Sequence, residues 1–173
     1  MIGQNGWGED PEGATPLGPE EMEGLRPSWV TDRDDLNAAE ADNIRSAVLK
    51  WENRRNRLET LFDDKTVRDL HRDMFGDVWR WAGTYRQRET NIGVAPSMIS
   101  TEVRSLVEDA KYWFAEDSSM PLEEAAAHLH HRLVKIHPFP NGNGRLAREL
   151  TDLVLISRGR APFTWGRIDL VIA

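Results

Sequence analysis

Apolar side chains recur every three to four residues in five stretches of the chain, with charged residues between them. This spacing places the apolar side chains on one face of an α-helix. The five stretches are 31–51, 64–75, 100–116, 121–136 and 142–158. The expected inward positions are Leu36, Ile44, Ala47, Val48 and Trp51; Val67, Leu70 and Met74; Val103, Leu106, Val107, Ala110, Trp113 and Phe114; Leu122, Ala126, Leu129, Leu133 and Ile136; and Leu146, Leu150, Leu153 and Val154. The pattern predicts an all-α domain.

The segments outside these helices have a different composition. Residues 1–30 are rich in glycine, proline and acids and have little periodicity, which is typical of an arm preceding the domain of residues 31–173. Within that arm, residues 19–25 begin with proline and predict one short helix. Residues 90–94 alternate weakly before a proline and predict a short edge hairpin. A last short helix is expected after Trp165.

The most informative stretch reads His-Pro-Phe-Pro-Asn-Gly-Asn-Gly-Arg-Leu-Ala-Arg, from residue 137 to residue 148. Gly142 and Gly144 allow backbone angles that turn successive N–H groups to one side, forming a nest for an anion. The helix that begins there adds unpaired N–H groups and the positive end of its dipole. Arg145 and Arg148 share one helix face, and guanidinium groups suit phosphate oxygens. The stretch therefore predicts a polyphosphate site.

His137 lies just upstream of this nest and supplies an imidazole with an unperturbed pKa of about 6.5. A group of that pKa can accept a proton near neutral pH, so we expect a base at the rim of the site. Each feature alone has an ordinary explanation, because glycine-rich turns before helices are common and a lone histidine is more often structural. The combination of all of them at fixed spacings favours the functional interpretation.

The same stretch resembles the signature of the Fic (Fic/Doc, or fido) family, His-x-Phe-x-(Asp/Glu)-Gly-Asn-Gly-Arg-x-x-Arg. Every named position matches except the acidic one, which is Asn141 here. Residues 81–86 (Trp-Ala-Gly-Thr-Tyr-Arg) and 91–94 (Asn-Ile-Gly-Val) also resemble that family. Residues 161–166 (Ala-Pro-Phe-Thr-Trp-Gly) are similar to the subgroup named mobile mystery protein B.

The resemblance covers roughly residues 31–173 and implies a Fic-type helical bundle with a short β-hairpin flap over the active site. It also implies a protein adenylyltransferase that moves AMP from ATP, with Mg²⁺, to a Ser, Thr or Tyr hydroxyl of a target protein. His137 would then be the catalytic base. Arg145 would bind the β-phosphate, and Arg148 the γ-phosphate. The nucleotide-binding residues implied are Asn141, Gly142, Asn143, Gly144, Arg145 and Arg148, with the Asn143 side chain beside the α-phosphate.

Asn141 departs from the family pattern. The acid at this position in the family ligates Mg²⁺, and a neutral amide oxygen is a weaker ligand for a hard cation. Slow turnover, an altered nucleotide and phosphate transfer as in the Doc branch all stay open. So does a nucleotide-binding Fic protein with little catalysis, although retention of His137 argues against it because binding needs no base.

Two further elements follow from the resemblance. The flap, formed by Thr90, Asn91, Ile92, Gly93 and Val94, would pair with the backbone of the target, as extended peptides do at sheet edges. Without the family, a surface loop is the simpler interpretation.

Many Fic proteins also carry an inhibitory helix, (Ser/Thr)-x-x-x-Glu-(Gly/Asn), whose glutamate pairs with the last motif arginine. Glu23-Gly24 matches its end, but Pro19 stands where Ser or Thr is expected, so a solvated acidic arm stays open. Glu40 is a second candidate for the glutamate.

Composition narrows the alternatives. The chain has 173 residues, a net charge of −7 and no cysteine, which argues against direct binding to nucleic acid and excludes thiolate chemistry. We find no signal peptide and no membrane span, and expect a cytoplasmic protein. A toxin-like role and an antitoxin or helix-turn-helix partner are implied by the subgroup. The cluster of His128, His130, His131 and His137 leaves a metalloprotein open, but no Glu or Asp completes a recognised zinc motif on that face.

Overall fold

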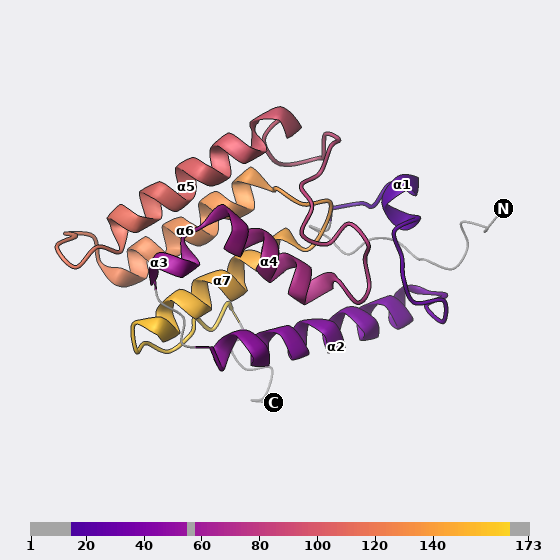
Figure 1. Cartoon of the computed structure of the whole chain (residues 1–173), viewed down its shortest axis with the longest axis horizontal. Helices are drawn as coiled ribbons and strands as arrows, with labels where there is room; N and C mark the ends of the chain where they lie inside the picture. The colour runs from indigo at the N-terminus through magenta and orange to yellow at the C-terminus, as the bar shows by residue number, and fades with distance from the viewer. Residues whose placement is uncertain (1–14, 55–57, 167–173) are drawn as a thin grey trace.

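The computed structural model describes residues 15–54 and 58–166 of the chain (Figure 1). These residues form helices and one isolated β-bridge but no strand, so the predicted all-α class is confirmed. The elements are α1 (Pro19–Met22), α2 (Arg33–Glu52), α3 (Leu58–Leu61), α4 (Asp64–Phe75), η1 (Pro96–Met98), α5 (Ile99–Trp113), α6 (Leu122–Ile136) and α7 (Asn143–Ser157).

The core lies between the five long helices. α6 packs on α7, α5 on α6, and α2 on α4, while α4 also contacts α5 and α7 (Figure 1). All the predicted inward positions are buried except Ile44, Val48, Trp113 and Leu122, which are half-buried. Apolar burial of this kind stabilises the bundle by roughly 25 cal/mol per Å² of surface removed from water. Within the described part of the chain, no helix combines the length and apolarity needed to cross a membrane.

The loop between α6 and α7 is fixed at both ends by left-handed backbone. α6 ends where His137 takes φ 56° and donates its N–H to the carbonyl of Leu133 at 3.1 Å. α7 begins after Gly142, whose φ is 80°. A Cβ at Gly142 would lie 2.6 Å from Cζ of Phe75, so only glycine fits both the angle and the space. The sequence thus places the base and the anion nest at one end of the bundle.

The described part of the predicted arm, residues 15–30, packs against the domain. Leu25 and Trp79 form an antiparallel bridge, since Arg26 N–H donates to the Val78 carbonyl and Arg80 N–H to the Gly24 carbonyl, each at 2.8 Å. This pairing brings residues 15–18 toward the loop between α6 and α7.

Residues 91–93 form bends, and the paired strands expected at 90–94 are not seen among the described residues. The neighbouring backbone is bonded to the α6–α7 loop instead. Arg86 N–H donates to the Pro138 carbonyl at 2.9 Å, and Val94 N–H to the Ile136 carbonyl at 3.2 Å. These bonds explain how a segment without strands keeps a defined position. The helix expected after Trp165 falls on residues 167–173, outside the described part of the chain; residues 165 and 166 form a turn.

Candidate active site

The imidazole of His137 has one defined tautomer. Its Nδ1 lies 3.3 Å from the carbonyl oxygen of Val134, and its Nε2 lies 2.6 Å from the hydroxyl of Thr15. A carbonyl can only accept, so Nδ1 carries the proton and Nε2 presents its lone pair. The Thr15 hydroxyl therefore donates to Nε2. A hydroxyl at this distance from an unprotonated imidazole nitrogen has the geometry of a nucleophile with its general base.

The surroundings favour the neutral form of that ring. Burial lowers the pKa of His137, the charge of Arg86 lowers it further, and the bond to the Val134 carbonyl offsets part of the change. His137 is only 5% exposed, whereas we expected its ring at the rim of the site. The difference arises because Thr15 covers the ring, which the helical pattern cannot show.

Arg86 is a buried cation that holds the backbone around His137. Its Nε donates to the His137 carbonyl at 2.7 Å, its Nη1 to the Arg88 carbonyl at 2.9 Å, and its Nη2 to the Val94 carbonyl at 2.5 Å. Burial lowers the pKa of Arg86, but such a group stays charged in any working range of pH. The guanidinium therefore ties the segment 86–94 to the end of α6. We did not assign Arg86 a role from the sequence.

Asn143 serves the turn rather than the nucleotide. Its Oδ1 accepts from Phe139 N–H at 2.9 Å, and its Nδ2 donates to the Phe139 carbonyl at 2.8 Å. The residue is 2% exposed, so neither amide atom is available to a ligand. This corrects the expectation that the Asn143 side chain binds the α-phosphate. Phe139 itself is fully buried and stacks on His71 with ring centres 3.8 Å apart.

His71, on α4, supports the same turn through hydrogen bonds. Its Nε2 lies 3.0 Å from the Asn141 carbonyl, to which it must donate, and its Nδ1 accepts from Gly83 N–H at 2.9 Å. Burial is the main reason that the pKa of His71 falls from 6.5 to about 3. A neutral imidazole thus fixes the backbone of Asn141 at ordinary pH. Sequence reasoning missed His71, although it shares the buried face of α4 with Val67 and Met74.

The pKa of His71 leads to a prediction about stability. Below pH 6.5 the unfolded chain binds a proton at this ring, and the folded chain does not until about pH 3. The free energy of unfolding is therefore expected to fall as pH drops from 6.5 to 3, by up to ~1.4 kcal/mol per pH unit from this residue. His71→Gln keeps one donor and one acceptor and should flatten the slope in urea titrations. Equal slopes for both proteins would contradict the assignment.

The amino end of α7 has the backbone features of the anion site that the sequence predicts. Its N-cap is Gly142, and no side chain caps this end within the described residues. The first backbone N–H groups and the dipole of a 15-residue helix are thus directed at any anion bound there. Gly142 N–H itself is taken by Asn141 Oδ1 at 2.6 Å.

Arg145 is held in place from three sides. Its Nη1 pairs with Glu40 at 2.5 Å, its Nη2 donates to Asn141 Oδ1 at 3.1 Å, and its guanidinium lies 4.7 Å from the centre of the Phe75 ring. Glu40 also accepts from Trp79 Nε1 at 2.7 Å and is buried. The structure thus brings Glu40, the second inhibitory candidate, to the first motif arginine.

Arg148 is the second motif arginine. A methyl group added at Gly144 would be 3.7 Å from Arg148 Nη1, so this guanidinium borders the nest backbone. Its charge also reaches Asp152. Burial raises the pKa of Asp152, and hydrogen bonds from Trp165 and Phe163 together with the charge of Arg148 lower it in part. The two motif arginines therefore lie in different surroundings.

Asn141 does not fit a direct Mg²⁺ ligand in this arrangement. Its Oδ1 accepts from Gly142 N–H and from the cationic Arg145, and its Nδ2 donates to the Thr15 carbonyl at 3.0 Å. An oxygen bonded to a guanidinium is electrostatically unsuited to a second cation. We therefore correct the expected metal role of Asn141 and derive no step through a protein-bound metal.

The predicted flap residues lie beside His137. A Cβ at Gly93 would be 2.8 Å from the Cβ of His137, and the φ of Gly93 is 114°. Thr90 precedes the bend that begins at Asn91, and its hydroxyl donates to the Ile92 carbonyl at 2.6 Å. The Ile92 side chain is exposed. Glycine at position 93 lets this backbone approach the base closely.

Glu23, the first inhibitory candidate, is the C-cap of α1. It is exposed, whereas Glu21, two residues earlier, forms an ion pair with Arg88 at 2.5 Å. The inhibitory pairing of Glu23 therefore stays a prediction. Among the other histidines, His128 faces Trp113 and His130 faces Trp165. Within residues 15–54 and 58–166, no three His, Asp or Glu side chains form a group suited to a metal.

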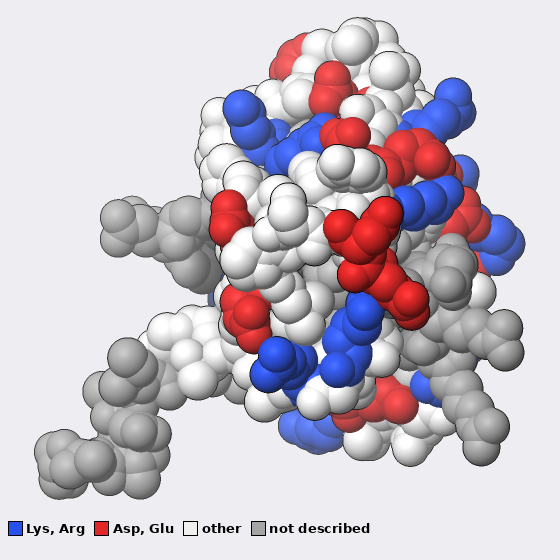
Figure 2. All heavy atoms as spheres, turned by 90° about the vertical axis from the view of Figure 1, so that its left-hand side faces the viewer, with Lys and Arg blue, Asp and Glu red and all other residues white. Residues whose placement is uncertain are grey.

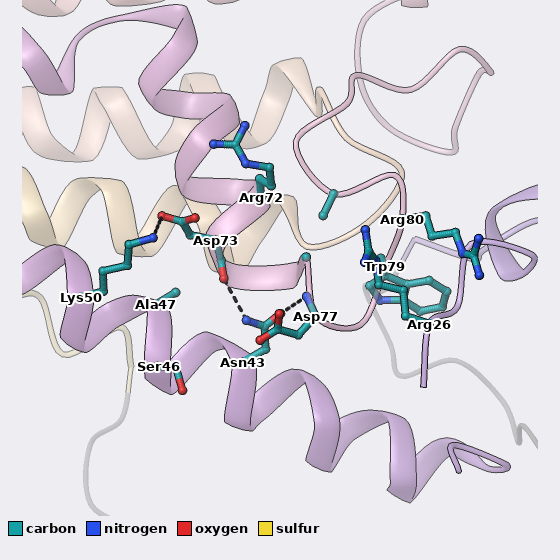
Figure 3. Close-up of a pocket in the computed structure, with 12 residues that line it drawn as sticks. Arg26, Asn43, Ser46, Ala47, Lys50, Arg72, Asp73, Asp77, Trp79 and Arg80 are labelled. Atoms are coloured by element: carbon teal, nitrogen blue, oxygen red, sulfur yellow. Dashed lines mark hydrogen bonds and ion pairs between the residues drawn. The ribbon is translucent and has the colours of Figure 1, made fainter. Parts of the chain in front are cut away.

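A groove with a volume of about 440 Å³ lies elsewhere, between α2 and the end of α4 (Figure 3). Four basic side chains line it, but Lys50 already pairs with Asp73 at 2.9 Å, and Asn43 bonds the Asp73 carbonyl and the Asp77 N–H. None of the residues of the 137–148 motif lines this groove. We assign it no role in the chemistry, because the base and the anion nest lie at the α6–α7 loop.

The fold and site define a helical domain with a neutral imidazole beside a loop–helix anion nest. Residues 61–155 match the model of the Fic/DOC family, and since this is more than half of the chain, the chain belongs to that family. It is 32% identical to protein adenylyltransferase fic-1 of Caenorhabditis briggsae over 111 residues, which are 60% of this chain and 21% of that protein.

Two other comparisons agree. A fido domain-containing protein of Dictyostelium discoideum is 37% identical over 81 residues, which are 44% of this chain and 56% of that protein. A solved Fic domain-containing signalling protein of Bacteroides thetaiotaomicron has a TM-score of 0.61 at 26% identity, over 70% of this chain and 48% of that one. The chain thus spans only about a fifth of the adenylyltransferase it matches.

Proposed function

We propose that the protein is a protein adenylyltransferase that moves AMP from ATP to a Ser, Thr or Tyr hydroxyl of a target protein. The observation that carries the proposal is the hydroxyl of Thr15 donating to the unprotonated Nε2 of His137 at 2.6 Å, one loop away from the anion nest. The name of the Caenorhabditis briggsae relative supports the same activity.

The residues of the site divide the work as follows. His137 Nε2 takes the proton of the attacking hydroxyl. The backbone N–H groups of residues 143 and 144, at the start of α7, hold the α-phosphate as its charge develops. Arg145 and Arg148 neutralise the β- and γ-phosphates, and pyrophosphate leaves from their side. ATP enters as its Mg²⁺ complex, so the cation belongs to the substrate.

Arg145 must exchange partners when ATP binds. In the structure its charge is already paired with Glu40, which itself is held by Trp79. A phosphate group therefore competes with a carboxylate for one guanidinium. We propose that the enzyme is autoinhibited by a glutamate that occupies a phosphate-binding arginine. The contacts favour Glu40 on Arg145 in this role. Pairing of Glu23 with Arg148 is the alternative.

The target is proposed to dock at residues 90–94. This segment borders His137 through Gly93 and carries the exposed Ile92 side chain, so an extended peptide laid along it would present its hydroxyl to the base.

The face shown in Figure 2 carries basic and acidic residues side by side, without a large basic patch for a nucleic-acid backbone.

The sequence also supports proposals about the subgroup, the biological role and the location of the protein. Residues 161–166 favour the mobile mystery protein B subgroup, and with it a toxin-like role with an antitoxin or helix-turn-helix partner. A cytoplasmic location would suit such a partner and a chain without cysteine.

Doc-like phosphate transfer is the competing function, because Asn141 replaces the family's acid. Parallel reactions with α-labelled and γ-labelled ATP in a cell lysate separate the two. Label transferred from the α position supports AMP transfer. Label transferred only from the γ position would replace our proposal with a protein kinase, and ATP binding with no transfer would leave a binding module.

Asn141→Asp is expected to raise Mg²⁺-dependent transfer about five- to tenfold. The carboxylate can satisfy Gly142 N–H and Arg145 with one oxygen and offer the other to the cation on the nucleotide, worth ~1 kcal/mol. It also loses the N–H that holds the Thr15 carbonyl. Rates measured across a Mg²⁺ titration test this. Identical curves for the two proteins would show that position 141 does not meet the cation.

A further inference from the structure

Thr15 occupies the place where the acceptor hydroxyl of a substrate belongs. Its hydroxyl donates to His137 Nε2 at 2.6 Å, and its side chain is buried, with the residue only 6% exposed. Its carbonyl accepts from Asn141 Nδ2 at 3.0 Å, while Asn141 Oδ1 holds Gly142 N–H at 2.6 Å. A single amide side chain thus connects Thr15 to the start of the anion nest.

The backbone after Thr15 is anchored so that this register is defined. The Pro16 carbonyl accepts from Arg88 Nη2 at 2.8 Å, and Arg88 Nε pairs with Glu21 of α1 at 2.5 Å. Leu17 packs against the core. We call residues 15–17 the strap. Its bonds run to the α6–α7 loop on one side and to the segment after α4 on the other, so Thr15 does not reach His137 by chance.

On the basis of the proposed function, we infer that Thr15 is a self-modification site: the chain transfers AMP to its own Thr15 hydroxyl, within one molecule. A threonine that only shields the imidazole would not have to lie beside the proposed nucleotide site. Here the same hydroxyl meets the lone pair of the base, and the Asn141 side chain links its residue to Gly142, the N-cap of the helix whose amino end is proposed to bind the α-phosphate.

The step balances with ATP alone. Thr15 Oγ attacks the α-phosphorus, the Oγ–Pα bond forms, and the bond from Pα to the oxygen bridging to the β-phosphate breaks. Pyrophosphate leaves, and the hydroxyl proton passes to His137 Nε2. The product is an AMP ester of Thr15, which has no hydroxyl proton left to donate. Self-modification therefore removes the hydrogen bond that covers His137 and opens the base to other targets.

The test is incubation of the purified full chain with MgATP, followed by intact mass and peptide mapping. We expect one added AMP on Thr15, with a half-time that does not change when the protein is diluted tenfold. Thr15→Ser should still be modified at residue 15, and Thr15→Val should not. Thr101→Val, which removes an exposed hydroxyl from α5, is the matched control and should be modified at Thr15 like the wild type.

A parallel lysate reaction with α-labelled ATP distinguishes failure of self-modification at Thr15 from failure of the proposed transferase activity. If His137-dependent label enters lysate proteins while Thr15 stays unmodified, the self-modification site is refuted and the transferase stands. If no protein is labelled at all, both are refuted. A half-time that lengthens on dilution rules out reaction within one molecule. Before Thr15 of the wild type is modified, Thr15→Val should also label lysate proteins about fivefold faster, because it lacks the ~1 kcal/mol bond that covers the base.

Discussion

Replacing His137 with alanine is expected to lower AMP transfer to target proteins by about 10²- to 10⁴-fold, the usual contribution of a general base. The loss should fall on the chemical step, because the nest and the two motif arginines stay in place to bind ATP. The structure gives this prediction a specific form, since Nε2 is the nitrogen that holds the lone pair while Nδ1 donates to Val134. Label transfer and ATP affinity are measured side by side.

The matched control is His128→Ala. His128 is exposed on α6, the helix that His137 caps, and its ring faces Trp113. This variant should transfer AMP at the wild-type rate. Transfer by His137→Ala at more than a tenth of the wild-type rate would mean that the imidazole serves only the fold. A parallel loss of ATP binding would instead point to collapse of the α6–α7 loop.

The helices were predictable because each one buries a single apolar face. The stripes at Leu129 and Leu133 on α6 and at Leu146 and Leu150 on α7 set both the element type and the buried side. Short elements were not predictable in this way. α3 spans four residues, too few to show a period of 3.6, and it was missed.

The site was predictable where the motif is local and not where partners come from elsewhere. The motif arginines and Gly142 could be placed because one loop and one helix contain them. Thr15, Arg86 and His71 meet the same loop from positions 51 to 122 residues away in the chain. The spacing of apolar residues along the chain carries no information about such contacts. The hairpin expected at 90–94 shows the same effect, since Val94 N–H donates to the Ile136 carbonyl at the end of α6 rather than to a partner strand.

Asn143 shows the opposite error. A polar side chain in a phosphate-binding motif was taken as a ligand, but both of its amide atoms bond the backbone of Phe139 four residues earlier. A tight turn buries backbone groups, and these must be satisfied before a ligand can be. The sequence alone does not distinguish an asparagine that stabilises the turn from one that the turn presents to a ligand.

Arg86→Met is expected to cost roughly 3–6 kcal/mol of unfolding free energy and to impair transfer severely. The guanidinium makes charge-assisted bonds to the carbonyls of His137, Arg88 and Val94, each worth about 1.5–3 kcal/mol. Methionine fills the same space but leaves these carbonyls without their donor. Such a loss is a large part of a typical stability of 5–15 kcal/mol, so urea unfolding should show it directly.

Arg86→Lys separates positioning from stability and keeps the test valid if the methionine variant does not fold. Lysine retains the charge but not the three-way fork, so we expect kcat to fall more than KM rises. The charge of Arg86 lowers the pKa of His137, and transfer needs the neutral ring, so activity is lost as pH falls through that pKa. Removing the charge should shift the acidic limb of the pH–rate profile to higher pH in Arg86→Met and leave it in place in Arg86→Lys. Unchanged profiles in both variants would reduce Arg86 to a purely structural residue.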